Sequence, residues 1–247
     1  MSFTLASYNV LADSYVKPEY YPRARREHLD PAWRRPALVE HIAKLDADVV
    51  CLQEVERATF EAIRERLAAT HTGEYAQKLM WKPDGCAIFF RRGVFEPVSL
   101  EKRPYRDETG HVVLLAKLAH AGRTLLVATT HLRWEPPGKP HHVGHAQAQQ
   151  LVRMLEPGPT IVCGDLNATP ESDVINVFQE AGFEETFPET AFTANPNGRA
   201  KKIDYLLHSR ELVATPLSLR AIDDVTPLPS PEEPSDHLAI VARIDWS

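Results

Sequence analysis

The sequence has few cysteines and no long apolar segment. Only three of its 247 residues are cysteine, and no apolar run approaches the roughly 20 residues that an α-helix needs to span a bilayer. Cys51, Cys86 and Cys163 are odd in number and each lies in an apolar stretch, so we expect buried free thiols in a reducing compartment. The first ten residues lack a basic segment and are typical of a strand, not of a signal peptide. These features predict a cytoplasmic protein that does not enter a membrane.

The chain also lacks an excess of positive charge. It has 28 Lys and Arg residues against 34 Asp and Glu residues, a formal net charge of −6. This balance excludes a protein that is basic over its whole surface, so any polyanion has to be bound by a local patch. The glycine-rich phosphate loop of the P-loop nucleotide hydrolases is absent as well.

Strand and helix patterns alternate along the chain, without an internal repeat or a linker between two halves of different composition. The length fits one large domain, and we expect residues 1–247 to form it. Apolar patterns predict strands at 3–11, 48–53, 86–90, 112–118, 124–130, 160–163, 203–207, 212–219 and 238–244. Helical spacing predicts helices at 36–45, 59–69, 144–155 and 171–181. Because strands outnumber helices and many are joined by short turns, we expect a two-sheet α/β sandwich.

Polar side chains that can take part in catalysis recur where the predicted strands end. They are Asn9, Glu54, His131, Asp165, Asn167, Asp204, Asp236 and His237. Taken singly, each has an ordinary structural explanation, such as capping a helix or closing an Asx turn. That explanation does not account for five separate strands ending in carboxylate, amide or imidazole groups. A rigid scaffold presents catalytic groups at such positions, so we predict an active site there.

The oxygen donors in this set indicate a hard divalent cation. Glu54, Asp236 and the Asn9 amide are ligand types that suit Mg²⁺ above all, with Mn²⁺ as the alternative. No cysteine occupies these positions, which argues against a structural zinc site. Mg²⁺ beside acid, base and amide groups can hydrolyse a phosphodiester: the metal neutralises developing charge, a carboxylate activates water and an imidazole moves a proton.

Two further groups of residues have competing interpretations. Histidines at four positions could suggest zinc, but their loose spacing around a proline-rich loop favours solvated side chains: His131, His141, His142 and His145. The segment 17–35 mixes arginines, Arg34 among them, with tyrosines and a tryptophan. Such a mixture could stack on bases and contact phosphates, or it could form a solvated loop, and both interpretations stay open.

The order of the motifs resembles the endonuclease/exonuclease/phosphatase superfamily, whose best-known member is of the pancreatic DNase I type. The resemblance runs from Tyr8-Asn-Val to Ser235-Asp-His, and Gly164-Asp-Leu-Asn167 together with that Ser-Asp-His is a highly specific pair. Tyr8-Asn-Val-Leu-Ala-Asp13, Asp84-Gly-Cys-Ala-Ile-Phe-Phe90 and His131-Leu-Arg-Trp-Glu-Pro136 are more similar to the deadenylase branch, which includes nocturnin and the 2′-phosphodiesterases. The resemblance implies a four-layer α/β/β/α sandwich with the active site across the top of two packed sheets.

The resemblance also implies roles for the residues at the strand ends. Glu54 would be the principal Mg²⁺ ligand, with Asn9 beside it and Asp236 as a further ligand or orienting group. Asp165 would position the attacking water, and Asn167 would contact the phosphate as its charge grows.

The remaining roles that it implies concern proton transfer and phosphate binding. His237 would be an acid/base residue held by Asp236, and Asp204 would complete the acidic cluster. His131 would bind the phosphate or aid the leaving group. Asp84 lies where nuclease relatives carry an acidic partner for that histidine, with a simple turn residue as the alternative.

Two positions bear on the substrate. Pro136 occupies the place of a base-contacting proline in the deadenylase branch. Five positions before Asp204, where the branch has an aromatic side chain that stacks on the base, this sequence has Arg199. Because a guanidinium can lie on any base face or reach a phosphate, we expect little preference for adenine.

We therefore expect a Mg²⁺-dependent phosphodiesterase, similar to a 3′-exoribonuclease, that hydrolyses RNA or oligonucleotides in one step and acts as a monomer. Phosphoinositides, sphingomyelin, apurinic DNA and protein–DNA adducts remain alternative substrates, because a fold does not determine its substrate. A catalytically inactive binding module is the alternative of another class. Intact Glu54, Asp165, Asn167 and His237 argue against it, because a decayed site should have lost at least one of them.

Overall fold

The structure is a computed structural model that describes residues 2–136 and 143–247. Its strands are β1 (Phe3–Asn9), β2 (Val49–Glu56), β3 (His71–Gln77), β4 (Asp84–Arg91), β5 (Glu96–Pro104), β6 (Val112–His120), β7 (Arg123–His131), β8 (Thr160–Asp165), β9 (Glu184–Glu185), β10 (Asp204–His208), β11 (Leu212–Pro216) and β12 (Ile240–Trp246). Its α-helices are α1 (Pro31–Lys44), α2 (Arg57–Arg66), α3 (Val143–Met154) and α4 (Asp173–Glu180). Short 3₁₀ helices are η1 (Asp13–Tyr15), η2 (Pro18–Tyr20), η3 (Arg26–Leu29) and η4 (Pro196–Gly198).

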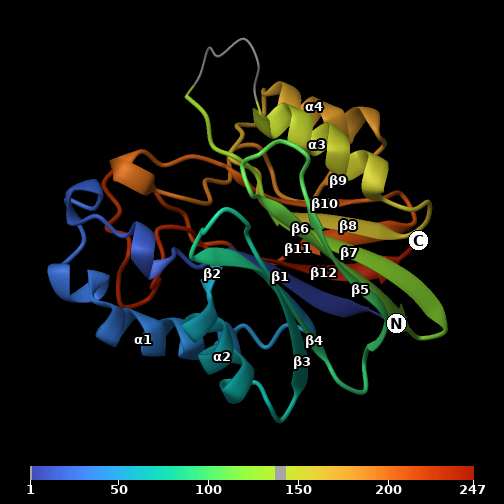
Figure 1. Cartoon of the computed structure of the whole chain (residues 1–247), viewed down its shortest axis with the longest axis horizontal. Coiled ribbons are helices and arrows are strands. Elements are labelled where there is room, and N and C mark those ends of the chain that lie inside the picture. Colours follow the sequence, from blue (N-terminus) through green and yellow to red (C-terminus); the bar gives the residue numbers. More distant parts are fainter. Residues whose placement is uncertain (1, 137–142) are drawn as a thin grey trace.

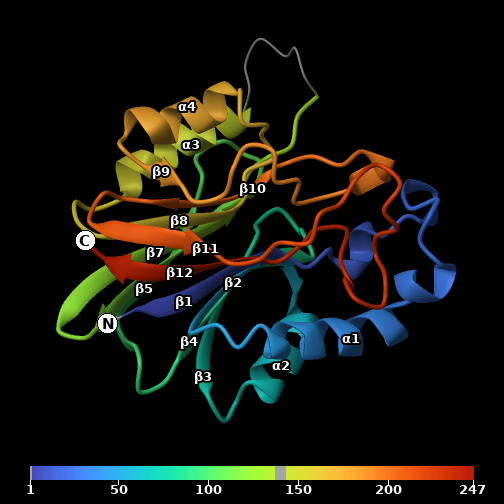
Figure 2. The same cartoon turned by 180° about the vertical axis from the view of Figure 1, so that it is seen from behind.

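The strands form two six-stranded sheets. The first has the order β11-β12-β1-β2-β4-β3 and the second the order β5-β6-β7-β8-β10-β9. Figure 1 and Figure 2 show α1 and α2 on one side of the molecule and α3 and α4 on the other, with the sheets between them. Within each sheet one central pair is parallel, β1 with β2 and β7 with β8, while the other pairs are antiparallel.

Three hydrophobic layers hold the sandwich together. Side chains alternate along the central strands, so Leu5 and Cys51 pack between the sheets while Ala6 and Leu52 pack under α1 and α2. A third cluster joins the second sheet to α3 and α4. Strands buried on both faces read as continuous apolar runs, which is why the sequence shows them so clearly. The architecture is the expected four-layer α/β/β/α sandwich.

Some elements depart from the sequence prediction. α1 begins at Pro31, five residues before the predicted start, because the Asp30 carboxylate accepts a hydrogen bond from the Ala32 amide at 2.8 Å and caps the helix. β3 and β5 were not predicted. β3 is mostly polar and contains Gly73, and β5 is a largely exposed edge strand with a proline near each end, so neither shows an apolar pattern.

The three cysteines are buried and free, as expected, and all three lie in the layer between the sheets. Within the described ranges, every helix is too short or too polar to cross a membrane.

Candidate active site

The ends of three adjacent strands in the second sheet place predicted residues in one row. β7 and β8 run parallel, and their register sets His131 beside Asp165. β10 runs antiparallel to β8, so its first residue, Asp204, is the register partner of Asp165. Strand pairing thus gathers three residues that lie far apart in the sequence at one edge of the sandwich.

The first sheet contributes Asn9 and Glu54. β1 ends at Asn9, which pairs with Gln53 of the parallel strand β2. Between Leu52 and Val55, β2 has one more residue than its partner β4, and this bulge includes Glu54, whose φ is 57°. A bulge re-aims a side chain, and a left-handed glutamate costs backbone energy that is tolerated mainly at functional positions. The bulge brings the Glu54 carboxylate within 3.2 Å of the Asn9 amide nitrogen.

Asn9 links the two sheets. Its Nδ2 also donates to Asp165 Oδ2 at 2.9 Å, and its Oδ1 accepts from the Leu11 amide at 3.0 Å. Glu54 Oε2 accepts from the Ala12 amide at 3.0 Å. The buried Asn9 amide therefore fixes the Glu54 and Asp165 carboxylates relative to each other.

The Gly164-Asp-Leu-Asn167 segment depends on two unusual backbone conformations. Gly164 has a φ of +141°, and a Cβ there would lie 2.0 Å from the Thr130 carbonyl oxygen, so no larger residue fits. Asn167 has a φ of 49°, which asparagine tolerates, and its amide N–H donates to Asp165 Oδ1 at 2.9 Å. Its side-chain nitrogen lies 2.9 Å from His131 Nε2. The turn thus places Asn167 between Asp165 and His131.

His237 is held by Asp204. Its Nδ1 lies 2.8 Å from Asp204 Oδ2, which also accepts from Thr193 Oγ1 at 2.7 Å. The expectation that Asp236 holds this imidazole is wrong: Asp236 Oδ2 instead accepts a hydrogen bond from the Tyr21 hydroxyl at 3.2 Å. Neighbours in the loop before β12 point in different directions, and the resemblance alone did not indicate which acid pairs with the histidine.

The carboxylates around His237 determine its charge. Burial by itself lowers the pKa of His237, but Asp204, Asp236 and Asp165 outweigh burial and raise it to about 10. Burial raises the pKa of Asp165 to about 7, against the opposing effect of His237. Burial also raises the pKa of Glu54, which the positive charge of Lys78 partly offsets.

A buried ion pair lies behind His131. Lys78 Nζ donates to Asp84 Oδ2 at 2.6 Å and lies 3.2 Å from His131 Nδ1, while the Tyr15 hydroxyl donates to Asp84 Oδ1 at 2.7 Å. Burial and then the Lys78 charge lower the pKa of His131 well below its usual value. The acidic residue predicted beside this histidine thus reaches it through a lysine, which the sequence analysis missed. The available signal was that Lys78 and Asp84 bracket the turn between two strands.

Several of these groups are suited to a cation. Two sets in the described part of the chain bring ligand atoms within 4.8 Å of one another: Glu54, His131 and Asp165, and Asp165, Asp204 and His237. Asp236 Oδ1 is buried without a hydrogen-bond partner among the described residues, and an orphaned carboxylate oxygen is a free donor for a metal. Hard oxygen donors fit Mg²⁺ or Mn²⁺.

The structure separates the residues predicted to bind substrate. Arg34 is only 2% exposed and its guanidinium binds the Asp13 carboxylate and the Val10 carbonyl oxygen, so its predicted substrate contact is wrong. The other interpretation, a solvated loop, does not fit Arg34 either, because its buried guanidinium holds η1 in place. Pro136 and Arg199 are exposed in loops that follow β7 and η4. His141 and His142 lie outside the described residues.

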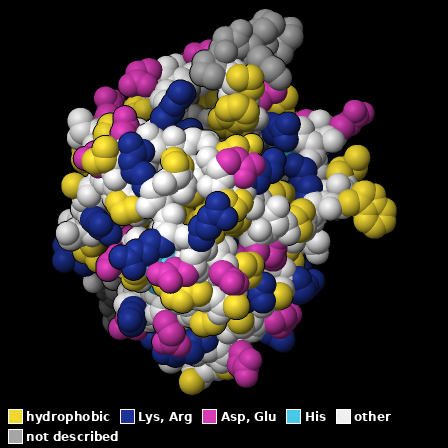
Figure 3. Space-filling model, turned by 90° about the vertical axis from the view of Figure 1, so that its left-hand side faces the viewer, with side chains coloured by type: hydrophobic (Ala, Val, Ile, Leu, Met, Phe, Trp, Pro, Cys, Tyr) yellow, Lys and Arg dark blue, Asp and Glu magenta, His cyan; other side chains and the backbone are white. Residues whose placement is uncertain are grey.

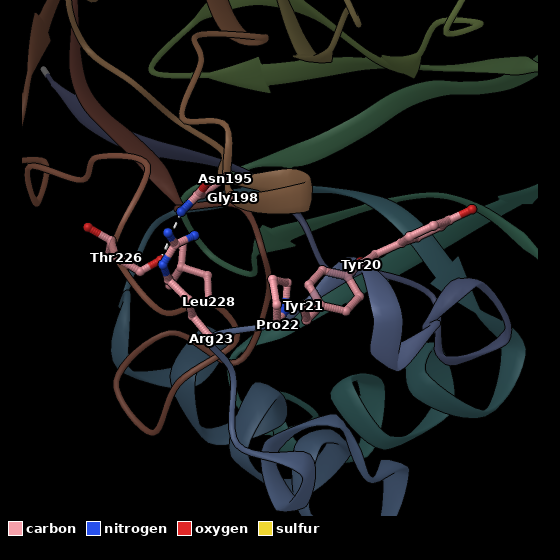
Figure 4. Close-up of a pocket in the computed structure, with 8 residues that line it drawn as sticks. All are labelled: Tyr20, Tyr21, Pro22, Arg23, Asn195, Gly198, Thr226 and Leu228. Carbon is pink, nitrogen blue, oxygen red and sulfur yellow. Dashed lines mark hydrogen bonds between the residues drawn. The ribbon is translucent and has the colours of Figure 1, made fainter.

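The aromatic and basic segment around η2 packs against the loop that carries Arg199. Figure 4 shows the Arg23 guanidinium beside Asn195 and Gly198, and Asn195 Nδ2 donates to the Thr226 carbonyl oxygen at 2.8 Å. The hollow between these segments has a volume of about 10 Å³. Because that is room for about one water, a base can only lie outside it.

Comparison with known proteins agrees with this geometry. The model of the Endonuclease/Exonuclease/phosphatase family matches residues 6–237. Human protein angel homolog 2 is 31% identical over 205 residues, 72% of this chain and 37% of that protein. The CCR4-Not complex 3′-5′-exoribonuclease subunit Ccr4 of Kluyveromyces lactis is 26% identical over 331 residues, 100% of this chain and 41% of that protein. The chain spans half or less of the length of these curated relatives.

Solved structures share the fold. ANGEL2, described as a 2′,3′-cyclic phosphatase, superposes with a TM-score of 0.88 at 24% identity, covering 99% of this chain and 95% of that one. The human Nocturnin catalytic domain gives a TM-score of 0.76 at 24% identity, covering 100% and 94%. These relatives are those that the resemblance in the sequence implied. The chain belongs to the Endonuclease/Exonuclease/phosphatase family, whose members are nucleases and phosphatases.

Proposed function

We propose that this protein is a divalent-metal-dependent phosphodiesterase that hydrolyses single-stranded RNA or oligonucleotides from the 3′ end. The observation that carries the proposal is the buried cluster at the strand ends. There Asp165 Oδ2 lies 2.9 Å from Asn9 Nδ2, 3.6 Å from His131 Nε2 and 3.8 Å from His237 Nε2. A carboxylate, an amide and an imidazole at strand ends, with a second imidazole on the loop before β12, form a preorganised site for phosphoryl chemistry.

Glu54 and Asp236 would hold the metal, with Asn9 positioning the Glu54 carboxylate. A bound Mg²⁺ would supply positive charge to the phosphate oxygens as negative charge develops on them. Two observations support this assignment: burial raises the pKa of Glu54, against the partial offset of Lys78, and Asp236 Oδ1 has no hydrogen-bond partner among the described residues. A cation beside these carboxylates would stabilise their charged forms.

Asp165 acts as the group that orients and deprotonates the attacking water. A general base is most effective when its pKa lies near the working pH, and burial raises the pKa of Asp165 to about 7. His237 is protonated at neutral pH and binds a phosphate oxygen through Nε2, while Asp204 holds its Nδ1. Asn167 donates its side-chain amide to the phosphate, and neutral His131 contacts the phosphate or the leaving oxygen beside it.

The choice of RNA rests on the relatives and on Pro136. Ccr4 of K. lactis is named as a 3′-5′-exoribonuclease, and human 2′,5′-phosphodiesterase 12 is 25% identical over 97% of this chain. Pro136 stands where the deadenylase branch has a base-contacting proline, and it is exposed after β7. Arg199 in place of an aromatic residue implies weak discrimination between bases.

A 2′,3′-cyclic phosphate is the second candidate substrate. Angel homolog 2, at 31% identity, is the relative that favours it, because ANGEL2 is described as a 2′,3′-cyclic phosphatase. A cyclic phosphate at an RNA 3′ end is also a phosphodiester, so the same groups would act on it.

Product analysis on a labelled panel tests the proposal. The panel contains 3′-tailed oligoadenylate, oligouridylate, mixed RNA, matched DNA, 2′-5′ oligoadenylate, adenosine 2′,3′-cyclic phosphate and inositol phosphates, each with Mg²⁺ or with a chelator. We expect Mg²⁺-dependent release of nucleotides from the 3′ end of RNA. Internal cleavage, faster cleavage of DNA, or turnover of the cyclic phosphate alone would contradict the 3′-exoribonuclease assignment.

Glu54→Gln tests the metal site. Removing one charge from a site with few ligands severely weakens a metal that dehydrates reluctantly, so we expect loss of activity to background with the fold intact. Mg²⁺ binding is measured by calorimetry and turnover on the best RNA. Glu65→Gln, on the exposed face of α2, is the matched control. Wild-type affinity and rate in Glu54→Gln would remove Glu54 from the metal site.

A further inference from the structure

The turn between β3 and β4 exposes three consecutive apolar side chains. Leu79 is 51% exposed, Met80 65% and Trp81 fully exposed. Single exposed apolar residues are common on protein surfaces, whereas a contiguous exposed group that includes a tryptophan usually marks a contact site.

This turn is held in a costly conformation. Met80 and Trp81 have φ values of 58° and 60°, in the left-handed region that non-glycine residues seldom occupy. The turn is anchored below its tip, where the Leu79 amide donates to the Gly110 carbonyl oxygen at 2.8 Å and the Lys78 amide donates to the Asp84 carbonyl oxygen at 2.9 Å. Two successive left-handed residues form the centre of a hairpin turn, which the Lys82 amide closes by donating to the Leu79 carbonyl oxygen at 3.4 Å. Because glycine and asparagine suit these positions better, and Trp81 gains no burial, neither turn formation nor packing accounts for a tryptophan there.

The turn lies at the rim of the active site. Trp81 is three residues from Lys78 and three from Asp84, and Lys78 Nζ is 3.2 Å from His131 Nδ1. The residues at the base of the turn, Lys78 and Asp84, therefore lie at the site, and Trp81 lies on the exposed tip between them. Figure 3 looks onto the edge of the molecule where β1 ends, and there protruding hydrophobic side chains lie next to Lys and Arg side chains.

Positive charge is concentrated beside Trp81. Lys82 follows it in the turn, and Arg133, two residues after His131, is exposed. Burial lowers the pKa of Lys82, and the charges of Lys78 and Arg133 lower it further, whereas Asp84 and Asp107 oppose them. Lys82 and Arg133 thus lie close enough to repel each other, whereas the charge of Lys78 is balanced by its ion pair with Asp84. An anion bound there would relieve the repulsion.

We propose that Trp81, Lys82 and Arg133, here called the hairpin rim, bind a nucleotide next to the one whose phosphate is cleaved. Trp81 stacks on its base, and Lys82 and Arg133 contact its phosphate. Aromatic side chains flanked by cations are how proteins bind single-stranded nucleic acid without reading its sequence. The inference rests on the proposed function and deepens it: the substrate is a strand of several nucleotides, and a mononucleotide leaves the rim empty.

Kinetics on two substrate lengths test the rim. Trp81→Ala should raise KM for a ten-nucleotide RNA about 10-fold, the effect of losing one base stack, with kcat unchanged. KM for an aryl ester of a mononucleotide, which has no neighbouring nucleotide and leaves the rim empty, should stay within about two-fold of the wild-type value. Trp81→Phe keeps an aromatic face and should stay near wild type. Val98→Ala, which changes an exposed apolar residue on β5, is the matched control.

Binding measured without hydrolysis separates this inference from the proposed function. In a chelator, the ten-nucleotide RNA should quench tryptophan fluorescence, and Trp81→Phe should lose most of that quenching. Lys82→Ala should weaken binding and reduce the slope of log Kd against log salt by about 0.7, the effect of one phosphate contact on a single strand. Lys44→Ala, at the far end of α1, should leave the slope unchanged.

The outcomes are distinct. If neither the wild type nor any variant hydrolyses RNA, but quenching still depends on Trp81, the proposed phosphodiesterase activity is contradicted and nucleotide binding by the hairpin rim is supported. If Trp81→Ala hydrolyses both substrates with wild-type KM, and Trp81→Phe shows unchanged quenching, the proposal that the hairpin rim binds a nucleotide is overturned. The exposed turn would then be assigned to contact with a protein partner.

Discussion

The two histidines of the candidate active site lie in similar positions but in opposite electrostatic surroundings. His131 and His237 are both buried, and each places Nε2 within 4 Å of Asp165 Oδ2, at 3.6 Å and 3.8 Å. His237 faces carboxylates, which raise its pKa to about 10. Burial lowers the pKa of His131 well below the usual value, and the neighbouring Lys78 and His111 lower it further.

The difference teaches that residue type does not fix the role of a histidine. At neutral pH His237 carries a charge and can stabilise a phosphate oxyanion, whereas neutral His131 can only donate or accept a hydrogen bond. The two halves of the site also have different rims. The His237 half adjoins the loop that carries Arg199, through pairing of Ala194 with His237, and the His131 half adjoins the hairpin rim.

The largest expected effect comes from removing the carboxylate between the two histidines, or the charged histidine itself. Asp165→Asn and His237→Ala should each lower kcat by about 10²–10⁴-fold, the usual contribution of a positioned acid/base group, with smaller changes in KM. Steady-state kinetics on the best RNA measure this. Asp173→Asn, on the exposed first turn of α4, is the control for Asp165→Asn. A variant that keeps wild-type kcat would return its residue to a purely structural role.

The stability of the protein above pH 8 reports the charge of His237. Because the folded pKa of about 10 lies above the ordinary 6.5, the Asp204–His237 pair stabilises the fold fully below pH 6.5 and loses this contribution as pH rises through 10. Between pH 8 and pH 10, the free energy of unfolding should fall in the wild type by on the order of 1–3 kcal/mol more than in His237→Gln.

Urea unfolding in the presence of a chelator measures this difference. His131→Gln is the matched variant for the comparison of the two histidines: since the pKa of His131 is lowered, the ring is neutral throughout this range and the variant should follow the wild-type slope. Equal slopes in all three proteins would mean that His237 is neutral in the fold.

A third prediction concerns what keeps His131 neutral and in place. Lys78→Met removes the donor beside His131 Nδ1. Asp84 then keeps its hydrogen bond from the Tyr15 hydroxyl. We expect kcat/KM to fall about 10-fold, because groups that act as a unit couple strongly. The double variant Lys78→Met/His131→Ala should lose no more kcat/KM than His131→Ala alone. Additive losses would show that Lys78 acts independently of His131, and unfolding measurements on Asp84→Asn check for simple destabilisation of the pair.

Most of the fold was predictable because the central strands are buried on both faces. β2 and β8 each contain a buried apolar run, and the site residues Glu54 and Asp165 follow these runs within the same strands. β3 and β5 could not be predicted, because a polar strand and an edge strand with prolines lack an apolar pattern. In these two strands the stabilisation comes from pairing with β4 and β6, which local sequence does not encode.

The same limit applies to the site. The motifs indicated which residues would meet, but partner choice depends on side-chain direction in loops. His237 is adjacent to Asp236 in the sequence, yet it pairs with Asp204 at the start of β10. Arg34 belongs to a segment for which substrate contact and a solvated loop were both open, yet its side chain is buried and binds Asp13 of η1. Lys78 carries no motif, and its importance appears only when the β3–β4 register places it opposite Asp84.

The smallest expected effect sharpens the comparison at the rim on the His237 side. Arg199 is exposed directly after η4, where the deadenylase branch has a stacking aromatic. The neighbouring hollow, which Gly198 lines, has room for about one water, so a base would contact Arg199 from the solvent side. Arg199→Phe should raise kcat/KM for oligoadenylate relative to oligouridylate by about 3- to 5-fold, because purines stack more strongly on an aromatic ring, while Arg199→Lys should show no such bias. Competition between the two labelled substrates in one reaction measures the ratio directly. A strong adenylate bias already present in the wild type would mean that the Arg199 guanidinium does not contact the base. An unchanged ratio in Arg199→Phe would place base contact entirely on the His131 side, at Pro136 and the hairpin rim.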